Sequence, residues 1–270
     1  FNSVKRQAKV VLTGDAGDET FLGYPYYRTF ELLDLAGRTL ELIPLLRLIV
    51  NPLMGFTPRT LQKKLNLLLN PSILPEVYAE MKSDDVCLSL LRKKSPDDTT
   101  REKFLALAKH KNLRGAKLLQ YLDITTSLPA RMLFKLDRIS MHFGIEGRSP
   151  LVDSQLVELA LSLPAAMHLS LISGGKTTLK KNLRSDFSRS FYQRRKVGFQ
   201  PAYHSLFRED EVFSLMSCFK ARENAFSQFI DNSKAISLAE EGIKGSRLAK
   251  QRVWRLLTLA NYLERIEKLF

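Results

Sequence analysis

The chain has 270 residues, of which 44% are hydrophobic and 26% charged, so it can form one large domain or two small ones with a buried core. Its net charge of +14 is compatible with nucleic acid, an anionic membrane surface or a polyanionic small substrate such as ATP. Two cysteines and four isolated histidines provide neither a disulfide framework nor zinc-ligand spacing, which favours a reducing cytoplasm.

The most apolar stretch, residues 40–56, contains Arg47 and is interrupted by Pro44 and Pro52. It is too short and too broken to span a bilayer, so we expect no membrane partner. The sequence begins at Phe1 rather than Met, and we expect further sequence upstream of it.

A short apolar run meets a group of acidic residues near the start of the chain. Residues 10–12 read Val-Val-Leu, which is too short for a helix core but sufficient for a buried parallel strand. Gly14 and Gly17 follow, and they permit a sharp turn and a close approach to a ligand. Three carboxylates then lie at the carboxyl end of the strand, where open α/β sheets bind ligands and where oxygen ligands suit Mg²⁺ with nucleotide phosphates. They are Asp15, Asp18 and Glu19. The alternative is a strand–turn–helix junction with acidic helix capping.

The residues that follow are predicted to be mainly helical, and we assign no site to the region that begins at residue 70. An aromatic cluster at residues 21–27 marks a helix start, in which Tyr24 either stacks on a base or packs internally, with packing favoured. Leucines at three- and four-residue spacing predict helices over residues 30–69, with breaks at prolines. Short helices follow, and the capping-box spacing of Thr99 and Glu102 starts another.

Residues 113–143 are predicted to form two helices separated by Pro129. The second helix is expected to bury Met132, Leu133, Leu136, Ile139 and Phe143. Spacings of four, three and four residues also place a basic stripe on this helix. The basic stripe consists of Arg131, Lys135, Arg138 and His142. It is either a solvated face or a wall that faces phosphates.

Local structure explains the next patterns without catalysis. Glu146 and Arg148 are spaced for pairing with neighbours rather than with each other on a helix face. Asp153 or Ser154 caps an amphipathic helix that ends at Pro164.

Two glycine-containing segments follow. Residues 172–178 include Ser-Gly-Gly-Lys-Thr but lack the first glycine of a phosphate loop, so we interpret them as a turn into a basic helix over residues 176–184. Residues 194–199 form either a flexible surface loop or a mobile loop whose Lys196 closes over a charged transition state.

The chain ends in a long amphipathic helix, predicted over residues 246–269. Its apolar face consists of Val253, Leu256, Leu257, Ala260, Leu263 and Ile266. This face is expected to pack against the domain, which leaves Trp254 partly buried.

Three separated motifs occur in the order found in one enzyme family. Residues 12–24 read Leu-Thr-Gly-Asp-Ala-Gly-Asp-Glu-Thr-Phe-Leu-Gly-Tyr and resemble the S-G-[DE]-G-x-D-E-x-F-G-G-Y segment of asparagine synthetases. Residues 135–153 are similar to that family's K-x-D-R-x-S-M…E-x-R-x-P-x-x-D signature, and residues 194–199 to its R-P-K-x-G-F loop. The resemblance covers essentially all 270 residues, as the later part of the synthetase domain of glutamine-hydrolysing asparagine synthetases and their β-lactam synthetase relatives.

This resemblance implies an α/β fold: a partial adenine-nucleotide α-hydrolase-like, or pyrophosphate-loop ATPase, domain. It is expected to be mostly helical in residues 1–270, with a short parallel strand near residues 8–12. The implied enzyme is a cytoplasmic ligase that activates a carboxylate as an acyl-adenylate with ATP and Mg²⁺ and then admits ammonia derived from glutamine. It would serve asparagine biosynthesis or the amidation of a carboxylate related to aspartate, and a homodimer stays open.

The resemblance also implies roles for particular residues. Asp18 matches the Mg²⁺ ligand, and Thr13 and Gly14 match the backbone that contacts the adenylate. Asp15 matches the acidic position tied to forming and consuming the intermediate, and Lys196 matches the loop lysine that stabilises developing charge. The residues interpreted as framework around the pocket are Asp137, Arg138, Glu146 and Arg148.

The sequence departs from the family pattern at several points. Ala16 and Leu22 replace glycines and Arg195 replaces the loop proline, and because none of these removes a charge we interpret them as drift. The Ser-Gly-Gly-x-Asp-Ser pyrophosphate loop and the glutaminase domain with its nucleophilic cysteine are absent from these 270 residues. We therefore expect a fragment without a second Mg²⁺ carboxylate or an ammonia source, which would not make an amide by itself.

Two other function classes stay open. One is a basic nucleic-acid-binding module related to tRNA-modifying ATPases, although the basic residues are dispersed and no aromatic-interleaved basic module is present. The other is an inactive helical interaction domain. An upstream Ser-Gly-Gly-x-Asp-Ser sequence would favour the ligase, and a salt-sensitive shift of labelled tRNA would favour the nucleic-acid module.

Overall fold

The computed structural model describes residues 1–42, 59–82, 90, 100–109, 112–192, 217, 228–244 and 247–267. The chain divides into two units, each with its own core. The first unit comprises residues 1–81 and 100–195, and the second comprises residues 82–99 and 196–270.

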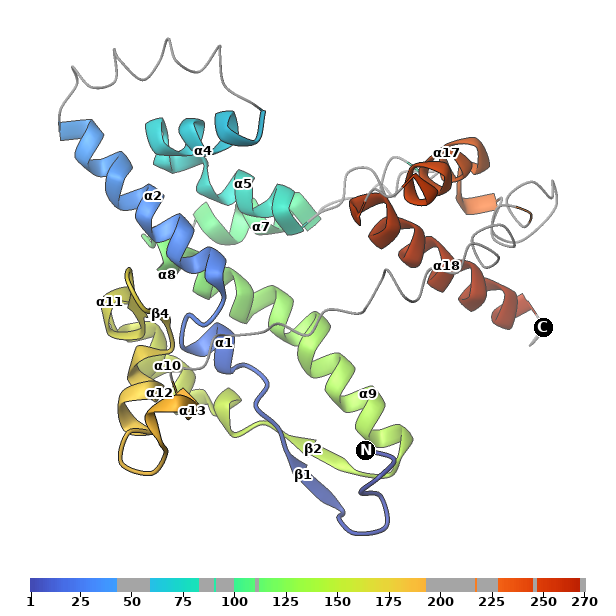
Figure 1. Cartoon of the computed structure of the whole chain (residues 1–270), viewed down its shortest axis with the longest axis horizontal. Coiled ribbons are helices and arrows are strands. Elements are labelled where there is room, and N and C mark those ends of the chain that lie inside the picture. The colour runs from blue at the N-terminus through green and yellow to red at the C-terminus, as the bar shows by residue number, and fades with distance from the viewer. Residues whose placement is uncertain are drawn as a thin grey trace. The chain divides into compact units, whose positions relative to one another are not determined.

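The acidic segment near the start of the first unit follows a short parallel strand (Figure 1). Strand β1 (Val10–Leu12) pairs with strand β2 (Glu146–Arg148), with Val10 opposite Glu146 and Leu12 opposite Arg148. The predicted strand and the mostly helical α/β character are therefore confirmed. The strand is less buried than its apolar sequence predicts, because Val10 and Leu12 are 43% and 70% exposed. A parallel pair becomes fully buried only where both of its faces are covered.

Helices form most of the first half of this unit. The aromatic residues 21–27 do not start a single helix as predicted, because a turn over residues 21–24 separates two helices. Pro25 occupies the first turn of the second helix, where its missing N–H costs nothing. The elements are α1 (Gly17–Thr20), α2 (Pro25–Leu42), α4 (Arg59–Leu69), η2 (Pro71–Ile73), α5 (Leu74–Lys82) and α7 (Thr100–Lys109).

Pro129 does not separate two helices, contrary to the prediction. Helix α8 (Gly115–Leu122) continues into a π-helical segment, η3 (Asp123–Leu133), and then into α9 (Phe134–His142). A proline breaks an α-helix because its ring meets the carbonyl four residues earlier, and the wider π turn shifts hydrogen bonding to the fifth residue. Along the apolar face, Leu136 is buried as expected, whereas Ile139 is 45% exposed.

The remaining elements of the first unit are short. Asp153 caps helix α10 by accepting a hydrogen bond from the Leu156 N–H at 3.1 Å, and α10 ends before Pro164, as predicted. The antiparallel pair of β3 and β4 then leads into a basic helix, which confirms the predicted turn over residues 172–178. The elements are η4 (Pro150–Val152), α10 (Ser154–Ser162), α11 (Ala165–His168), β3 (Leu169–Ser170), β4 (Gly174–Gly175), α12 (Thr177–Asn182) and α13 (Arg189–Tyr192).

The second unit is described mainly by two helices, α17 (Asn232–Ile243) and α18 (Arg247–Glu267), which pack against each other. Val253 and Leu256 of the predicted apolar face are buried, and Trp254 is half-buried as expected. No helix in the described ranges combines the length and apolar character needed to cross a membrane.

A buried carboxylate lies in the core of the first unit. Asp123, which is 1% exposed, begins the π-helical segment. Its Oδ2 accepts hydrogen bonds from the hydroxyls of Tyr26 at 2.5 Å and Tyr27 at 2.8 Å, and its Oδ1 accepts one from the Tyr78 hydroxyl at 2.6 Å. The cluster of Asp123 and its three tyrosines therefore joins α2, α5 and η3.

Replacing Asp123 by Ala leaves these tyrosine hydroxyls without their acceptor. Because an unsatisfied buried polar group costs about 1–3 kcal/mol, we expect Asp123→Ala to lower the free energy of unfolding by about 3 kcal/mol or more. Urea unfolding followed by circular dichroism measures the change. Asp137→Ala, at an exposed position on α9, is the matched control and should change stability by about 0.5 kcal/mol or less. A similar loss in the two variants would contradict this role of Asp123.

Candidate active site

The loops that follow β1 and β2 are joined at the carboxyl end of the sheet. The Thr13 N–H donates to the Arg148 carbonyl at 2.8 Å, and the Ser149 hydroxyl donates to the Asp15 carbonyl at 2.6 Å. Further along, the Thr20 hydroxyl donates to a main-chain carbonyl of η4 at 3.2 Å. Two segments about 130 residues apart in sequence therefore form one edge, at the position where parallel sheets present ligand sites.

A third segment contributes a lysine to this edge. The ammonium of Lys176 lies 2.8 Å from Oδ1 of Asp18, and both side chains are half-buried. The Lys176 N–H also donates to the Phe21 carbonyl at 2.9 Å, and Phe21 packs edge-on against the buried His168. The sequence pattern gives the Gly-Gly-Lys segment no role, because it does not match a phosphate loop. Its placement beside Asp18 depends on long-range contacts with residues 21–23, which no local pattern indicates.

Two glycines permit the close contact between these segments. A Cβ atom on Gly23 would overlap Oδ1 of Asp18 and the side chain of Lys176, and a Cβ atom on Gly175 would overlap the Leu22 carbonyl. Side chains at these two positions would force Lys176 away from Asp18. The Asp18–Lys176 pair therefore requires glycine at both positions.

Backbone strain is concentrated around the same ion pair. Three residues other than glycine in the described ranges have positive φ: Ala16 at 67°, Leu22 at 52° and Lys176 at 61°. This conformation costs an L-residue about 1–2 kcal/mol. Ala16 and Leu22 are the positions at which the family pattern has glycine, so their replacement is not neutral drift but adds strain beside Asp18.

A buried glutamate follows Asp18 directly. Glu19 is 2% exposed and accepts a hydrogen bond from the Tyr24 hydroxyl at 2.7 Å. Burial raises the pKa of the Glu19 carboxyl above its ordinary value, and the hydrogen bond from Tyr24 offsets only part of this shift. Tyr24 stacks on Tyr26 at a centroid distance of 5.3 Å, which agrees with the prediction that Tyr24 packs internally.

The predicted adenylate contacts lie at the open part of the edge. The Thr13 hydroxyl oxygen is buried and has no hydrogen-bond partner among the described residues. Gly14 is exposed, and a Cβ atom built on it would meet nothing within 4 Å. Asp15 is half-buried beside them. The open space for a ligand therefore lies beside Gly14, whereas the Thr13 hydroxyl is closed to solvent in this structure.

The residues predicted as framework lie on the surface near the sheet. Arg148 Nε donates to Glu146 Oε1 at 2.8 Å, so these two side chains pair with each other, contrary to the prediction. They lie on a strand, where residues two apart share a face. Asp137 and Arg138 are exposed on α9, and the Arg138 guanidinium lies 5.1 Å from the centroid of the Phe134 ring.

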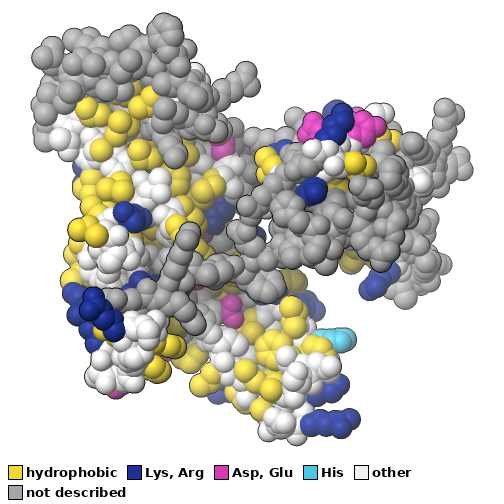
Figure 2. Space-filling model, viewed as in Figure 1, with side chains coloured by type: hydrophobic (Ala, Val, Ile, Leu, Met, Phe, Trp, Pro, Cys, Tyr) yellow, Lys and Arg dark blue, Asp and Glu magenta, His cyan; other side chains and the backbone are white. Residues whose placement is uncertain are grey.

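The other predicted functional groups have different outcomes. Every member of the basic stripe is exposed, and the Lys and Arg side chains on the face in Figure 2 lie at several separate places. Lys196 and the whole segment 194–199 lie outside the described residues.

The carboxylates present suit a metal that is carried by its substrate. Among the described residues, no group of three or more His, Cys, Asp or Glu side chains could hold a metal ion. Mg²⁺ commonly uses only one or two carboxylates together with substrate phosphates and water, which is compatible with Asp18 and Asp15 at this edge. Lys176 neutralises Asp18 and would compete with a cation for Oδ1.

The comparisons with known proteins agree with this arrangement. The family profile described as asparagine synthase matches residues 1–264. A putative glutamine-hydrolyzing asparagine synthetase of Mycobacterium tuberculosis is 26% identical over 258 residues, covering 94% of this chain and 39% of that protein. Glutamine-hydrolyzing asparagine synthetase 1 of Bacillus subtilis is 25% identical over 265 residues, covering 94% of this chain and 40% of that protein. No solved structure gives a significant match.

The match over residues 1–264 supports a class of carbon–nitrogen ligase-like enzymes. The chain belongs to the asparagine synthase family. It spans about two fifths of the length of the curated relatives that it matches.

The strain at Ala16 predicts a stabilising substitution. Ala16→Gly removes the Cβ penalty at φ 67°, and we expect it to raise the free energy of unfolding by about 0.5–1 kcal/mol. Ala36→Gly, at an exposed position inside α2, should lower it by about 1 kcal/mol because glycine is unfavourable within a helix. Chemical denaturation of both variants provides the measurement. A loss of stability in Ala16→Gly would show that Ala16 is not strained.

The buried Glu19 predicts a dependence of stability on pH. Because its pKa is raised in the folded protein, the native state binds the Glu19 proton more tightly than the unfolded state, where the pKa is about 4.3. This contribution to stability is therefore present below that value and is lost as pH rises through the folded-state pKa. Glu19→Gln keeps an acceptor for Tyr24 and lacks the charge, so it should lose this slope and be more stable than the wild type at neutral pH.

Urea unfolding across the acid-to-neutral range compares the Glu19→Gln variant with the wild type. Glu158→Gln, at an exposed position on α10, controls for the loss of one negative charge. Parallel pH profiles for the wild type and Glu19→Gln would refute the assignment.

Proposed function

We propose that this chain is the later part of the synthetase domain of an ATP-dependent, amide-forming ligase of the asparagine synthetase type. The proposed cofactors are ATP and Mg²⁺, and the proposed acceptor is the carboxylate of aspartate or an analogue. The proposed fold of the complete domain is adenine-nucleotide α-hydrolase-like. Ammonia derived from glutamine is the proposed nucleophile, because the relatives are described as glutamine-hydrolyzing asparagine synthetases.

The convergence of three distant segments carries this proposal. The loops after β1 and β2 and the segment of Lys176 meet at one strand end, which presents Asp18, the open Thr13–Gly14 backbone and Lys176. The backbone is strained there at Ala16 and Leu22, and the close contact requires glycine at positions 23 and 175. Strained backbone of this kind persists only where the surrounding contacts enforce it, and it is found most often at active sites. An acidic helix cap alone would not require a half-buried lysine beside it.

The groups at this edge have complementary roles in the proposal. ATP supplies the adenylyl group that activates the carboxylate, and Mg²⁺ screens the charge of the departing pyrophosphate. Asp18 would hold Mg²⁺, and the Thr13–Gly14 backbone would orient the adenylate. Asp15 would act at the step that forms and consumes the intermediate.

Lysines supply the positive charge in this proposal. Lys176, which is paired with Asp18, would turn towards phosphate oxygens when Mg²⁺ takes the carboxylate. Lys196 is proposed to stabilise the negative charge that develops at the reacting phosphate. The two residues are twenty positions apart, and Lys176 was identified only because the structure places it beside Asp18.

Binding of ATP with and without Mg²⁺ tests the site. We expect Mg²⁺ to tighten ATP binding to the wild-type chain and Asp18→Asn to remove that Mg²⁺ increment, a loss of about tenfold, while Mg²⁺-free binding persists. Lys176→Met should weaken binding in both conditions, because it removes a cation that faces phosphate. Isothermal titration calorimetry measures all three proteins.

Asp186→Asn, at an exposed position outside the site, controls for the loss of a carboxylate. An unchanged Mg²⁺ increment in Asp18→Asn would reject Asp18 as the Mg²⁺ ligand. ATP–pyrophosphate exchange that depends on aspartate, measured on a longer form with a Ser-Gly-Gly-x-Asp-Ser loop, then tests the carboxylate substrate.

A further inference from the structure

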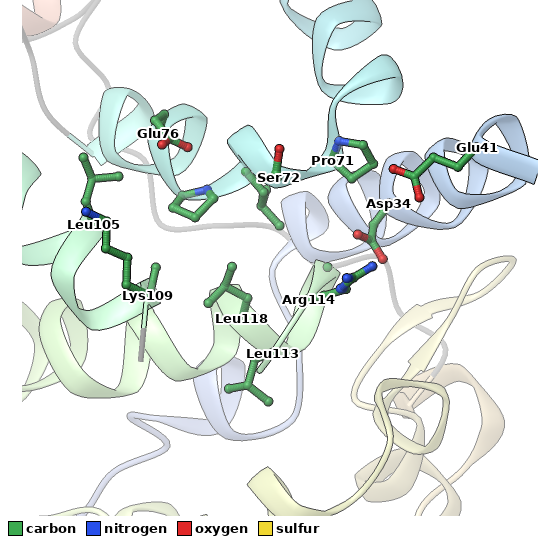
Figure 3. Close-up of a pocket in the computed structure, with 14 residues that line it drawn as sticks. Asp34, Glu41, Pro71, Ser72, Glu76, Leu105, Lys109, Leu113, Arg114 and Leu118 are labelled. Carbon is green, nitrogen blue, oxygen red and sulfur yellow. The ribbon is translucent and has the colours of Figure 1, made fainter. Parts of the chain in front are cut away.

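A cavity lies in the first unit, among α2, α5, α7 and α8 (Figure 3). Its volume is about 450 Å³, which is within the range of small-molecule sites. None of the residues proposed for adenylation lines it.

Glu76 lines the cavity, and one oxygen of its carboxylate is buried without a hydrogen-bond partner among the described residues. Oε2 of Glu76 is inaccessible to solvent and has no hydrogen-bond partner among the described residues. An unpaired buried carboxylate oxygen is costly, and a cation relieves this cost better than a neutral donor because charge-assisted hydrogen bonds are about twice as strong. Glu76 lies at one end of the lining residues in Figure 3.

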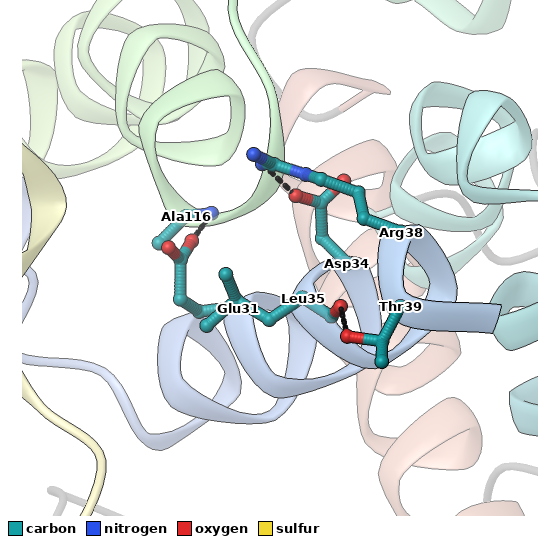
Figure 4. A network of polar contacts seen from close by, with 6 residues as sticks. All are labelled: Glu31, Asp34, Leu35, Arg38, Thr39 and Ala116. Atoms are coloured by element: carbon teal, nitrogen blue, oxygen red, sulfur yellow. Dashed lines mark hydrogen bonds and ion pairs between the residues drawn. The ribbon is translucent and has the colours of Figure 1, made fainter. Parts of the chain in front are cut away.

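The other carboxylates near this cavity already have partners. Asp34 is paired with Arg38 on the next turn of α2, and Glu31 accepts the Ala116 N–H at 2.7 Å (Figure 4). Glu41, which also lines the cavity, has an interaction of its own. Among the described carboxylates that line the cavity, Glu76 is therefore the one with a buried oxygen that lacks a hydrogen bond.

The surroundings of Glu76 favour an organic cation over a metal ion. The described carboxylates form no metal-binding group, and the cavity wall combines polar residues with leucines, of which Leu74 and Leu118 are buried and Leu105 is half-buried. A strongly hydrated metal ion gains nothing from such a wall, whereas an alkyl chain does. Lys109 and Arg114 are exposed at the cavity, so a divalent metal ion would meet stronger repulsion there than a monovalent ammonium.

We propose that this cavity binds a small primary amine whose ammonium pairs with Glu76 and whose aliphatic body lies against the leucines. The cavity is separate from the proposed adenylation site, so this proposal does not depend on the ligase function. The ammonium would neutralise the Glu76 carboxylate as a whole, since Oε2 itself is closed to solvent, and the alkyl chain would lie against the leucines.

A set of matched six-carbon probes tests the proposal. Hexylamine, hexan-1-ol and hexanoate have the same chain and differ in the charge of the head group. For a ligand of this size we expect hexylamine to bind with a Kd of about 1 mM, and the alcohol and the acid at least about tenfold more weakly. Ligand-observed NMR titration of the whole chain measures the three affinities.

Variants separate the charge from the shape of the cavity. Glu76→Gln should weaken hexylamine binding about tenfold or more, whereas Glu102→Gln, at an exposed position on α7, should leave it unchanged. Ser72 is exposed and lines the cavity, so Ser72→Phe should block hexylamine without disturbing the core, and it provides the test if Glu76→Gln does not fold.

Three results would overturn the proposal. They are equal binding of the three probes, an unchanged affinity in Glu76→Gln or Ser72→Phe, and no detectable binding of hexylamine. The first would show simple apolar partitioning, and the other two would show that Glu76 and the cavity do not form the site.

Discussion

The carboxylate of Asp123 is the constraint on which the first unit depends. It is removed from water and would be costly to bury, but three tyrosine hydroxyls donate to it. Burial together with the nearby carboxylate raises the pKa values of Tyr26, Tyr27 and Tyr78 far above the ordinary value for tyrosine, so all three remain donors. Because these donors come from α2 and α5 while the acceptor begins η3, the cluster fixes three elements at once. It also orients the start of α2, directly after the turn that follows Asp18.

The cluster of Asp123 and its tyrosines stabilises elements close to the end of β1, where the backbone is strained. Ala16, Leu22 and Lys176 adopt backbone angles that glycine accepts more readily; Lys176 belongs to the Asp18–Lys176 pair, and Ala16 and Leu22 lie in the segment around Asp18. Glu19 adds a buried charge with a raised pKa in the same segment. The strained backbone and the buried Glu19 lower the stability of this segment. The same segment places the half-buried Asp18 carboxylate beside the half-buried Lys176 ammonium. Preorganised charges of this kind favour reactions in which charge develops on a phosphate.

The family match and the geometry of the strand end give different information about this chain. The motif order identifies the family and implies a role for Asp18, but it gives Lys176 no role. The structure gives Lys176 a position and leaves the acceptor carboxylate to the proposal. The cavity at Glu76 is independent of both, because neither the motifs nor the strand end involve it.

By itself the sequence determined the strand at residues 10–12, the cap at Asp153, the long terminal helix and the family, because each depends on local spacing or on motif order. Tertiary structure decided the rest. The helix continues through Pro129 because a π-helical segment accommodates the ring, and Glu146 pairs with Arg148 because strand geometry places them on one face. The pairing of Lys176 with Asp18 required contact between segments about 160 residues apart. Residue types alone could not indicate it, since such contacts are set by how elements pack and not by the propensity of either segment.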